Sequence, residues 1–371
     1  MMKRELCRTL VVFAGLLIFA GCAKPPAPMK VYWPAPPDTP KMEWIMTYYS
    51  EDSFPKTEGE KFAENIVGKK ELHFFQKPMG VASDGHGKMY VADMDLHNLR
   101  VVDFNARTME FFSKSPIFGL PVGVALDGSG RIFVCDAQAQ QVFVFAPDRS
   151  PLFVFGKGTL QKPGFLAFNE KLKRIYVTDV VGSKIEVFDY EGEHLFSFGG
   201  GGEKGGQIFT PYGIAVDSKG RVFVSAQLES RILVYDADGR YLYGFGQRGD
   251  EAFQFEGPRG LAFDSEDHLY VAESRKAALL VFDTEGNPLT RIGGERSASP
   301  LAFSLPTAVS VDQNDRIFIT DAFNRSVTIW QFLTPRYLKE HPLDPEMLKR
   351  IEERVERRQK ELQEKEGSKP R

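Results

Sequence analysis

Acidic residues recur at the ends of short strand-like runs, where carboxylates from distant parts of the chain could bind a cation together. The acidic positions are Asp93, Asp136, Asp179, Glu273 and Asp321, with Ala226 at the sixth equivalent place. Carboxylate oxygens are the ligands that hard cations such as Ca²⁺ prefer. Each carboxylate could instead accept hydrogen bonds in its own turn, or pair with a basic residue such as Arg100 or Arg231. Because five of six equivalent segments carry the acid, we favour the structural role.

Other motifs that bind cofactors are weak or missing in the sequence. Residues 200–205 and 244–249 fit the spacing G-x-G-x-x-G, but strands are predicted after both runs, whereas a dinucleotide site requires a helix there. No phosphate-binding P-loop, no G-x-S-x-G and no C-x-x-C-H haem motif occurs, and the six histidines show no pair at metal-ligand spacing. We therefore predict no nucleotide, no metal site and no cofactor.

One short motif, a proline followed by any residue, glycine, an apolar residue and alanine, is repeated along the middle of the chain. Its six copies, two of them altered, start 42 to 48 residues apart at Pro78, Pro121, Pro163, Pro211, Pro258 and Pro306. Each copy predicts short strands separated by turns that contain Gly or Asp. Four strands in about 46 residues are typical of one propeller blade. We therefore predict an all-β, six-bladed β-propeller with four-stranded antiparallel blades.

The repeated segment resembles the NHL repeat, as in segments 78–82 (Pro-Met-Gly-Val-Ala) and 211–215 (Pro-Tyr-Gly-Ile-Ala). The resemblance covers residues 42–333 and implies a six-bladed propeller that presents a binding surface to another molecule. Six-bladed relatives also include gluconolactonase-like hydrolases and the peptide-amidating lyase, which use a metal in the central channel. A metal-dependent channel-site hydrolase or lyase is therefore the alternative function.

The sixth copy lacks a fourth strand, since Thr334 and Pro335 follow its third strand without a new turn. A strand that could replace it lies at the other end of the repeats, in residues 42–49. Met42, Trp44, Met46 and Tyr48 alternate there and predict one common face. We predict that this N-terminal strand completes the sixth blade, closes the ring and removes the free sheet edges.

The first 21 residues have the pattern of a signal peptide. Three basic residues precede an apolar run over residues 10–20, which is too short to cross a bilayer as a helix. The run ends in Phe19, Ala20, Gly21 and Cys22, a sequence that resembles the lipobox of bacterial lipoproteins. The resemblance implies cleavage before Cys22 and lipidation of its thiol. An ordinary secreted protein with a chance cysteine is the alternative.

Two further segments flank the predicted propeller. Residues 22–41 hold the predicted lipidated cysteine and seven prolines, which predict an extended polyproline II tether. Residues 334–371 form a charged tail with a predicted helix from Pro345, capped by Asp344 and stopped at Gly367. This helix is either fully solvated or docks on a partner.

The residues between proline and glycine in the repeats should approach the mouth of a central channel. At this variable position stand Met79, Val122, Tyr212, Arg259 and Thr307. Tyr212 and Arg259 could hold a polar ligand there, or both could be solvated loop residues. The position before each acid is small, as at Cys135, so we expect Cys135 to be a buried packing residue and not a nucleophile.

These features predict a membrane-tethered lipoprotein that binds an envelope protein or ligand. We favour this binding role over an enzymatic one. Ala23 after Cys22 resembles the signal for the outer membrane of Gram-negative bacteria, facing the periplasm. The net charge of −3 excludes a strongly basic nucleic-acid binder. The expected contacts are therefore the membrane, through the lipid, and an envelope protein partner.

Overall fold

The computed structural model describes residues 30–35, 38–68, 71–200, 206–294 and 302–367. The predicted signal peptide and Cys22 lie outside the described residues. The described chain forms six antiparallel sheets, which confirms the predicted six-bladed all-β propeller. The first strands of neighbouring blades contact one another around a complete ring, so they are the innermost strands.

Five blades follow the sequence order from the innermost strand to the outermost. Blade 1 consists of β3 (Pro78–Ser83), β4 (Lys88–Asp93), β5 (Asn98–Asp103) and β6 (Thr108–Phe111). Blade 2 consists of β7 (Pro121–Leu126), β8 (Ile132–Asp136), β9 (Gln141–Phe145) and β10 (Pro151–Phe155). Blade 3 consists of β11 (Pro163–Asn169), β12 (Arg174–Asp179), β13 (Lys184–Asp189) and β14 (His194–Phe198). Blade 4 consists of β15 (Pro211–Val216), β16 (Val222–Ala226), β17 (Arg231–Tyr235) and β18 (Tyr241–Phe245). Blade 5 consists of β19 (Pro258–Phe263), β20 (Leu269–Glu273), β21 (Ala278–Phe282) and β22 (Pro288–Gly293).

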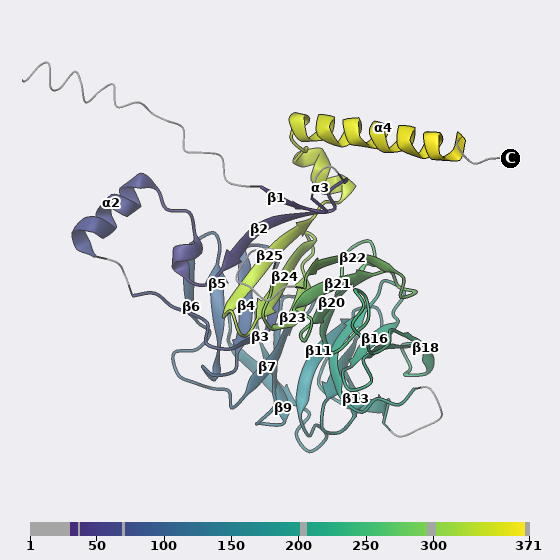
Figure 1. The fold of residues 1–371 in the computed structure, drawn as a ribbon. Coiled ribbons are helices and arrows are strands. Elements are labelled where there is room, and N and C mark those ends of the chain that lie inside the picture. Colours follow the sequence, from purple (N-terminus) through teal and green to yellow (C-terminus); the bar gives the residue numbers. More distant parts are fainter. Residues whose placement is uncertain (1–29, 36–37, 69–70, 201–205, 295–301, 368–371) are drawn as a thin grey trace, which may run out of the picture. The chain divides into compact units, whose positions relative to one another are not determined.

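Blade 6 joins the two ends of the repeat region. Its inner strands are β23 (Pro306–Val311), β24 (Arg316–Asp321) and β25 (Ser326–Phe332), and β2 (Met42–Tyr48) pairs antiparallel with β25 (Figure 1). The predicted closure by the N-terminal strand is confirmed. A fifth strand, β1 (Val31–Trp33), lies outside β2, within the segment that the sequence assigns to the tether. The Trp33 indole donates a hydrogen bond to Thr290 of blade 5 at 3.0 Å, so this part of the segment packs on the propeller.

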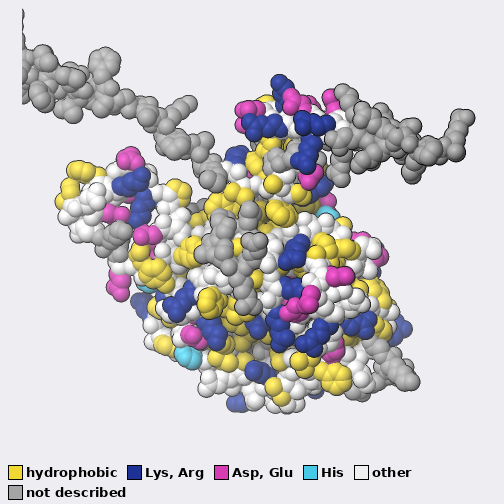
Figure 2. Space-filling view, viewed as in Figure 1, with side chains coloured by type: hydrophobic (Ala, Val, Ile, Leu, Met, Phe, Trp, Pro, Cys, Tyr) yellow, Lys and Arg dark blue, Asp and Glu magenta, His cyan; other side chains and the backbone are white. Residues whose placement is uncertain are grey.

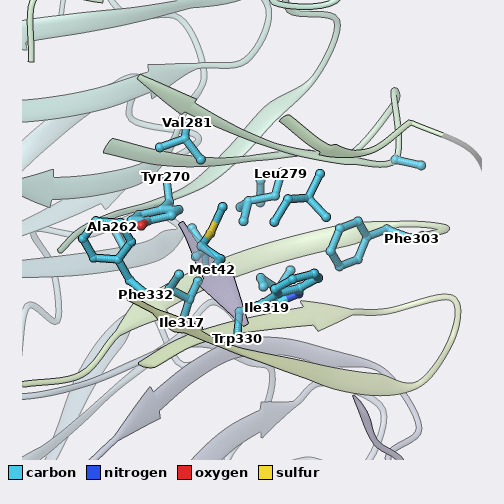
Figure 3. Packing of buried hydrophobic residues seen from close by; sticks show 14 residues of the cluster. Met42, Ala262, Tyr270, Leu279, Val281, Phe303, Ile317, Ile319, Trp330 and Phe332 are labelled. Carbon is cyan, nitrogen blue, oxygen red and sulfur yellow. The ribbon is translucent and has the colours of Figure 1, made fainter. Parts of the chain in front are cut away.

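The predicted single face of the closing strand is wrong. The register of β2 against β25 shifts between Trp44 and Met46, which is the sign of a bulge at Ile45. Met42 and Trp44 pack with blade 5 residues, whereas Met46 and Tyr48 pack with blade 1 residues. Figure 3 shows Met42 among side chains of blades 5 and 6. One bulge therefore lets a single strand fill two interblade cores.

Helices occur only outside the blades in the described part of the chain. They are the short η1 (Glu51–Ser53), α2 (Glu58–Val67), α3 (Pro335–Glu340) and α4 (Pro345–Gly367). The predicted C-terminal helix is confirmed, and the Asp344 carboxylate accepts the Glu346 N–H at 2.8 Å. The sequence analysis missed α2, although Thr57 and Glu60 form a capping box. No described helix is both long and apolar enough to cross a bilayer.

Helix α2 is amphipathic, and its large apolar side chains are mostly exposed. Its side chains Phe62 and Ile66 are both about two-thirds exposed, and Figure 2 shows hydrophobic side chains on α2. Its Glu60 reaches blade 1 through an ion pair with Arg107 at 3.0 Å. The helix is therefore held to the propeller by polar contacts, while its apolar side faces outward.

The two faces of the propeller are fixed by strand direction. The proline of each repeat lies opposite the last residue of the second strand, as Pro306 lies opposite Asp321. We call the face formed by these ends the proline face. Met42 pairs with Phe332 at the other end of blade 6. The first strand of the propeller, β2, therefore begins at the opposite face, and the last strand, β25, ends there. Both flanking segments consequently join the propeller away from the proline face.

Glycine allows the inner strands to approach each other closely. A Cβ atom at Gly213 would overlap the carbonyl oxygen of Arg259 and lie 2.9 Å from the Leu261 nitrogen. Both atoms belong to the backbone of the next blade, so neither can move independently. The central ring therefore leaves no room for a side chain at this position.

We predict that Gly213→Ala lowers the unfolding free energy by about 1–3 kcal/mol, because the new methyl group forces two inner strands apart. The control is Gly59→Ala in α2, where a Cβ would meet nothing within 4 Å. Chemical denaturation of both variants checks the prediction. Equal midpoints for the two variants would contradict the close packing at the ring.

Candidate ligand site at the centre of the proline face

The recurring acids fasten the loops that lead into the inner strands. The Asp136 carboxylate accepts hydrogen bonds from the N–H groups of Gly119 and Leu120, which precede the inner strand of its blade, and from Gln138 and Ala139 in the next turn. The other four acids likewise accept the two N–H groups before their own inner strand. The predicted structural role is confirmed.

Blade 4 achieves the same result with a different residue. Ala226 stands at the acidic position, and the Glu229 carboxylate instead accepts the Phe209 N–H at 2.9 Å. Of the two alternatives, hydrogen bonds within the turn are found and an ion pair with Arg100 is not, since the Arg100 side chain donates to the Phe74 carbonyl at 3.2 Å. A carboxylate near this turn is therefore needed by all six blades, although its position in the sequence can shift.

Burial raises the pKa of Asp93 and Glu273, because the loss of water around each carboxylate outweighs the hydrogen bonds that it accepts. These carboxylates serve separate blades and are occupied by backbone donors. No group of three or more His, Cys, Asp or Glu residues within the described ranges is placed to hold a metal ion. The ring of acids thus offers no shared cation site in this part of the chain.

The small residues that precede the acids do more than pack. Three of them carry hydroxyls that donate across the blade boundary: Thr178 to the Tyr212 carbonyl, Ser225 to the Arg259 carbonyl and Thr320 to the Met79 carbonyl. These hydrogen bonds hold the backbone of the residues at the channel mouth, a role that the sequence analysis missed. Cys135 is buried, and burial raises the pKa of its thiol, as expected for a packing residue.

Tyr212 and Arg259 come together at the channel mouth. The Arg259 guanidinium lies over the Tyr212 ring, 5.0 Å from its centroid. Phe165 also contacts Tyr212, and the centroids of the two rings are 5.2 Å apart. Phe165 stands at the glycine position of the altered third repeat, where Gly164 takes the variable position, and the sequence analysis did not include it among the ligand-facing residues. The structure thus forms an aromatic pair with a cation at one end.

Arg259 is the charged residue at this position of the repeat, and it affects the ionisation of its neighbour. Burial raises the pKa of Tyr212, and the nearby Arg259 opposes this shift. Met79, Val122 and Thr307 occupy the equivalent positions of blades 1, 2 and 6, and all three are buried. The Thr307 hydroxyl already bonds to the Pro78 carbonyl at 3.2 Å. A guanidinium among apolar residues does not suit the Ca²⁺ or Zn²⁺ that propeller enzymes use in their channels.

Apolar side chains are exposed in turns of blades 3 and 4 on the same face. Val181, Phe209 and Leu228 are 58%, 60% and 69% exposed. Phe209 lies between two turns, because its carbonyl accepts the Ser183 hydroxyl and its N–H donates to Glu229. Val181 and Leu228 belong to these turns of blades 3 and 4. We call these three residues the apolar patch.

The opposite face carries a polar cleft of about 410 Å³ between α3 and turns of blades 1 and 6. It brings together His86 and His341, which are far apart in the sequence. His341 stacks on Tyr337 with ring centroids 4.4 Å apart, and His86 contacts the Gln313 amide at 3.2 Å. The cleft offers hydrogen-bonding groups, but the two histidines are engaged with different neighbours.

Comparison with known proteins defines the class of fold. No family model matches the sequence, and no curated protein matches it significantly. A protein of unknown function from Bacteroides thetaiotaomicron VPI-5482 is 15% identical, with a TM-score of 0.59 over 69% of this chain and 70% of that protein. The structural similarity places the chain among six-bladed β-propellers.

Two enzymes have similar structures. A gluconolactonase from Xanthomonas campestris is 16% identical, with a TM-score of 0.53 over 70% of this chain and 87% of the enzyme. Virginiamycin B lyase from Staphylococcus aureus, in a structure with quinupristin, is 11% identical, with a TM-score of 0.53 over 79% of this chain and 99% of the enzyme. At these identities the likeness concerns the fold alone, and the NHL and lipoprotein assignments stay predictions.

We predict that Asp136→Asn lowers the unfolding free energy by about 2–3 kcal/mol, because an amide NH₂ would face backbone donors that the carboxylate now satisfies. Asp250→Asn is the control, since Asp250 is exposed and should change stability by no more than about 0.5 kcal/mol. Urea denaturation of both variants tests this. A neutral Asp136→Asn would show that the turn does not need the charge.

Proposed function

We propose that this chain is a lipid-anchored binding module of the cell envelope, which holds an envelope protein against the proline face of its propeller. The observation that carries the proposal is the apolar patch, where three large apolar side chains are more than half exposed on neighbouring turns. Contiguous exposed apolar side chains are typical of protein interaction sites. The described flanking segments join the propeller at the opposite face, so their points of attachment lie away from the patch.

The patch is also suited to binding by its stiffness. The Ser183 hydroxyl donates to the Phe209 carbonyl at 2.6 Å, and the Phe209 N–H donates to Glu229 at 2.9 Å. These bonds hold the backbone that presents the patch. A surface that is ordered before binding loses less conformational entropy when a partner docks.

The partner that fits is a protein with an apolar segment and no strong net charge. The net charge of this chain is only −3, and Figure 2 shows acidic, basic and hydrophobic side chains interspersed over the face in view. A nucleic acid or a strongly charged partner would need a field of one sign, which the composition does not supply. Apolar contact would therefore provide most of the affinity.

Replacement of the patch tests the docking surface. We expect Phe209→Ser together with Leu228→Ser to weaken capture of the envelope partner at least about tenfold, because central apolar contacts dominate interface energies. Leu172→Ser is the matched control, since Leu172 is similarly exposed but lies in a turn on the opposite face. Quantitative pull-down from envelope extracts, with melting curves for each variant, is the measurement. Equal capture by both variants would contradict docking on the proline face.

The lipid anchor is tested separately. We expect Cys22→Ala to yield an uncleaved precursor that does not incorporate labelled palmitate, because lipidation needs the thiol. Gel mobility and membrane fractionation of the variant and the parent chain provide the readout. Normal maturation of Cys22→Ala would refute the lipoprotein part of the proposal and leave the docking surface to its own test.

A further inference from the structure

We propose that the channel mouth binds a carboxylate, which Arg259 holds while Tyr212 and Phe165 pack against the apolar body that carries it. This site goes beyond the proposed docking function. It concerns a small group entering the channel, and the apolar patch does not take part.

The charge of Arg259 is not neutralised within the described chain. No carboxylate forms an ion pair with its guanidinium, and its Nε–H is buried without an acceptor. Arg100 and Arg291 also have buried guanidinium nitrogens without an acceptor among the described residues, whereas two other blade arginines are paired. Arg131 pairs with Asp127 at 2.7 Å, and Arg221 with Asp217. A buried donor without an acceptor is unfavourable, so a ligand oxygen here would satisfy a group that the fold leaves open.

The shape of the guanidinium selects the ligand group. Arginine presents a planar fork of N–H donors that matches the two oxygens of a carboxylate. One face of the fork is covered by the Tyr212 ring at 5.0 Å, which leaves its edge for hydrogen bonding. Arg259 brings the only charge among the six residues at this position of the repeat. A monoanion therefore fits this site better than a polyanion or a cation.

The aromatic residues select the body of the ligand. Phe165 and Tyr212 lie with ring centroids 5.2 Å apart, next to the guanidinium. Their rings offer apolar contact to an aromatic or aliphatic group attached to the carboxylate. Such a group is found both in small aromatic acids and at the C-terminus of a peptide that ends in an apolar residue. The chemistry recognised is the same for both sources.

The site is held in place before any ligand arrives. The Arg259 carbonyl accepts the Ser225 hydroxyl at 2.7 Å, and the Tyr212 carbonyl accepts the Thr178 hydroxyl at 3.0 Å. Gly213 lets the two inner strands approach so closely that no Cβ fits between them. The two side chains that would hold the ligand consequently project from a backbone that has little freedom to move.

Calorimetric titration of the propeller-bearing full chain with four probes tests the site. Phenylacetate and N-acetyl-phenylalanine carry the carboxylate, one as a small acid and the other as a mimic of a peptide C-terminus. Phenylacetamide and N-acetyl-phenylalanine amide are their neutral counterparts. We expect at least one acid to bind, and its amide to bind at least tenfold more weakly. The acid that binds more tightly identifies the source of the ligand.

Variants separate a specific site from general attraction. We expect Arg259→Gln to weaken the acid at least tenfold and Tyr212→Leu to weaken acid and amide alike, with melting temperatures close to the parent value. Arg325→Gln is the control, since Arg325 is exposed in a turn of the same face. No binding of either acid, equal binding of acid and amide, or unchanged affinity in Arg259→Gln would each overturn the proposal. None of these outcomes depends on capture of a protein partner.

Discussion

Closure of the ring is the constraint on which the rest of the structure depends, and it rests on the pairing of β2 with β25. A propeller buries apolar surface between neighbouring blades, so an unclosed ring would expose the facing sides of two blades. The bulge at Ile45 distributes the closing strand between both interfaces, with Met42 on one side and Tyr48 on the other. Across the same junction, the Thr320 hydroxyl donates to the Met79 carbonyl at the channel mouth. The junction of blades 6 and 1 is therefore held at its outer edge by β2 and at the central ring by this hydrogen bond from β24.

Within the closed ring, two kinds of contact determine where the mouth residues lie. The carboxylates fix the loops before the inner strands, as Asp136 does for Gly119 and Leu120. Glycine then removes the side chain that would keep neighbouring inner strands apart. The residue between proline and glycine is thus placed by its neighbours on both sides and is itself free to vary. The chemistry of the mouth can change without disturbing the fold.

The sequence predicted the blades, the closing strand and the C-terminal helix because each follows from a local pattern: repeat length, strand alternation and a helix cap. It also singled out Tyr212 and Arg259 as candidate ligand-facing residues. It could not predict their contact, since that depends on how neighbouring inner strands approach through space. The bulge at Ile45 was missed for a related reason, because a one-residue shift in register appears only when the partner strand is known. The role of Glu229 was also missed, because this residue does not stand at the sequence position that the other five acids share.

The same reasoning explains why the distinctive chemistry of this chain is concentrated on one face. In most blades the proline, the glycine and the acid are committed to geometry, and the strands are committed to interblade packing. Phe165 and Ala308 replace the glycine in blades 3 and 6, and Ala226 replaces the acid in blade 4. The remaining positions are the mouth residue and the turn tips, and on the proline face these include Arg259 and the apolar patch. On the opposite face, α3 lies beside turns of blades 1 and 6. Among the described residues, the guanidinium of Arg259, which has no ion-pair partner there, lies on the proline face and away from α3.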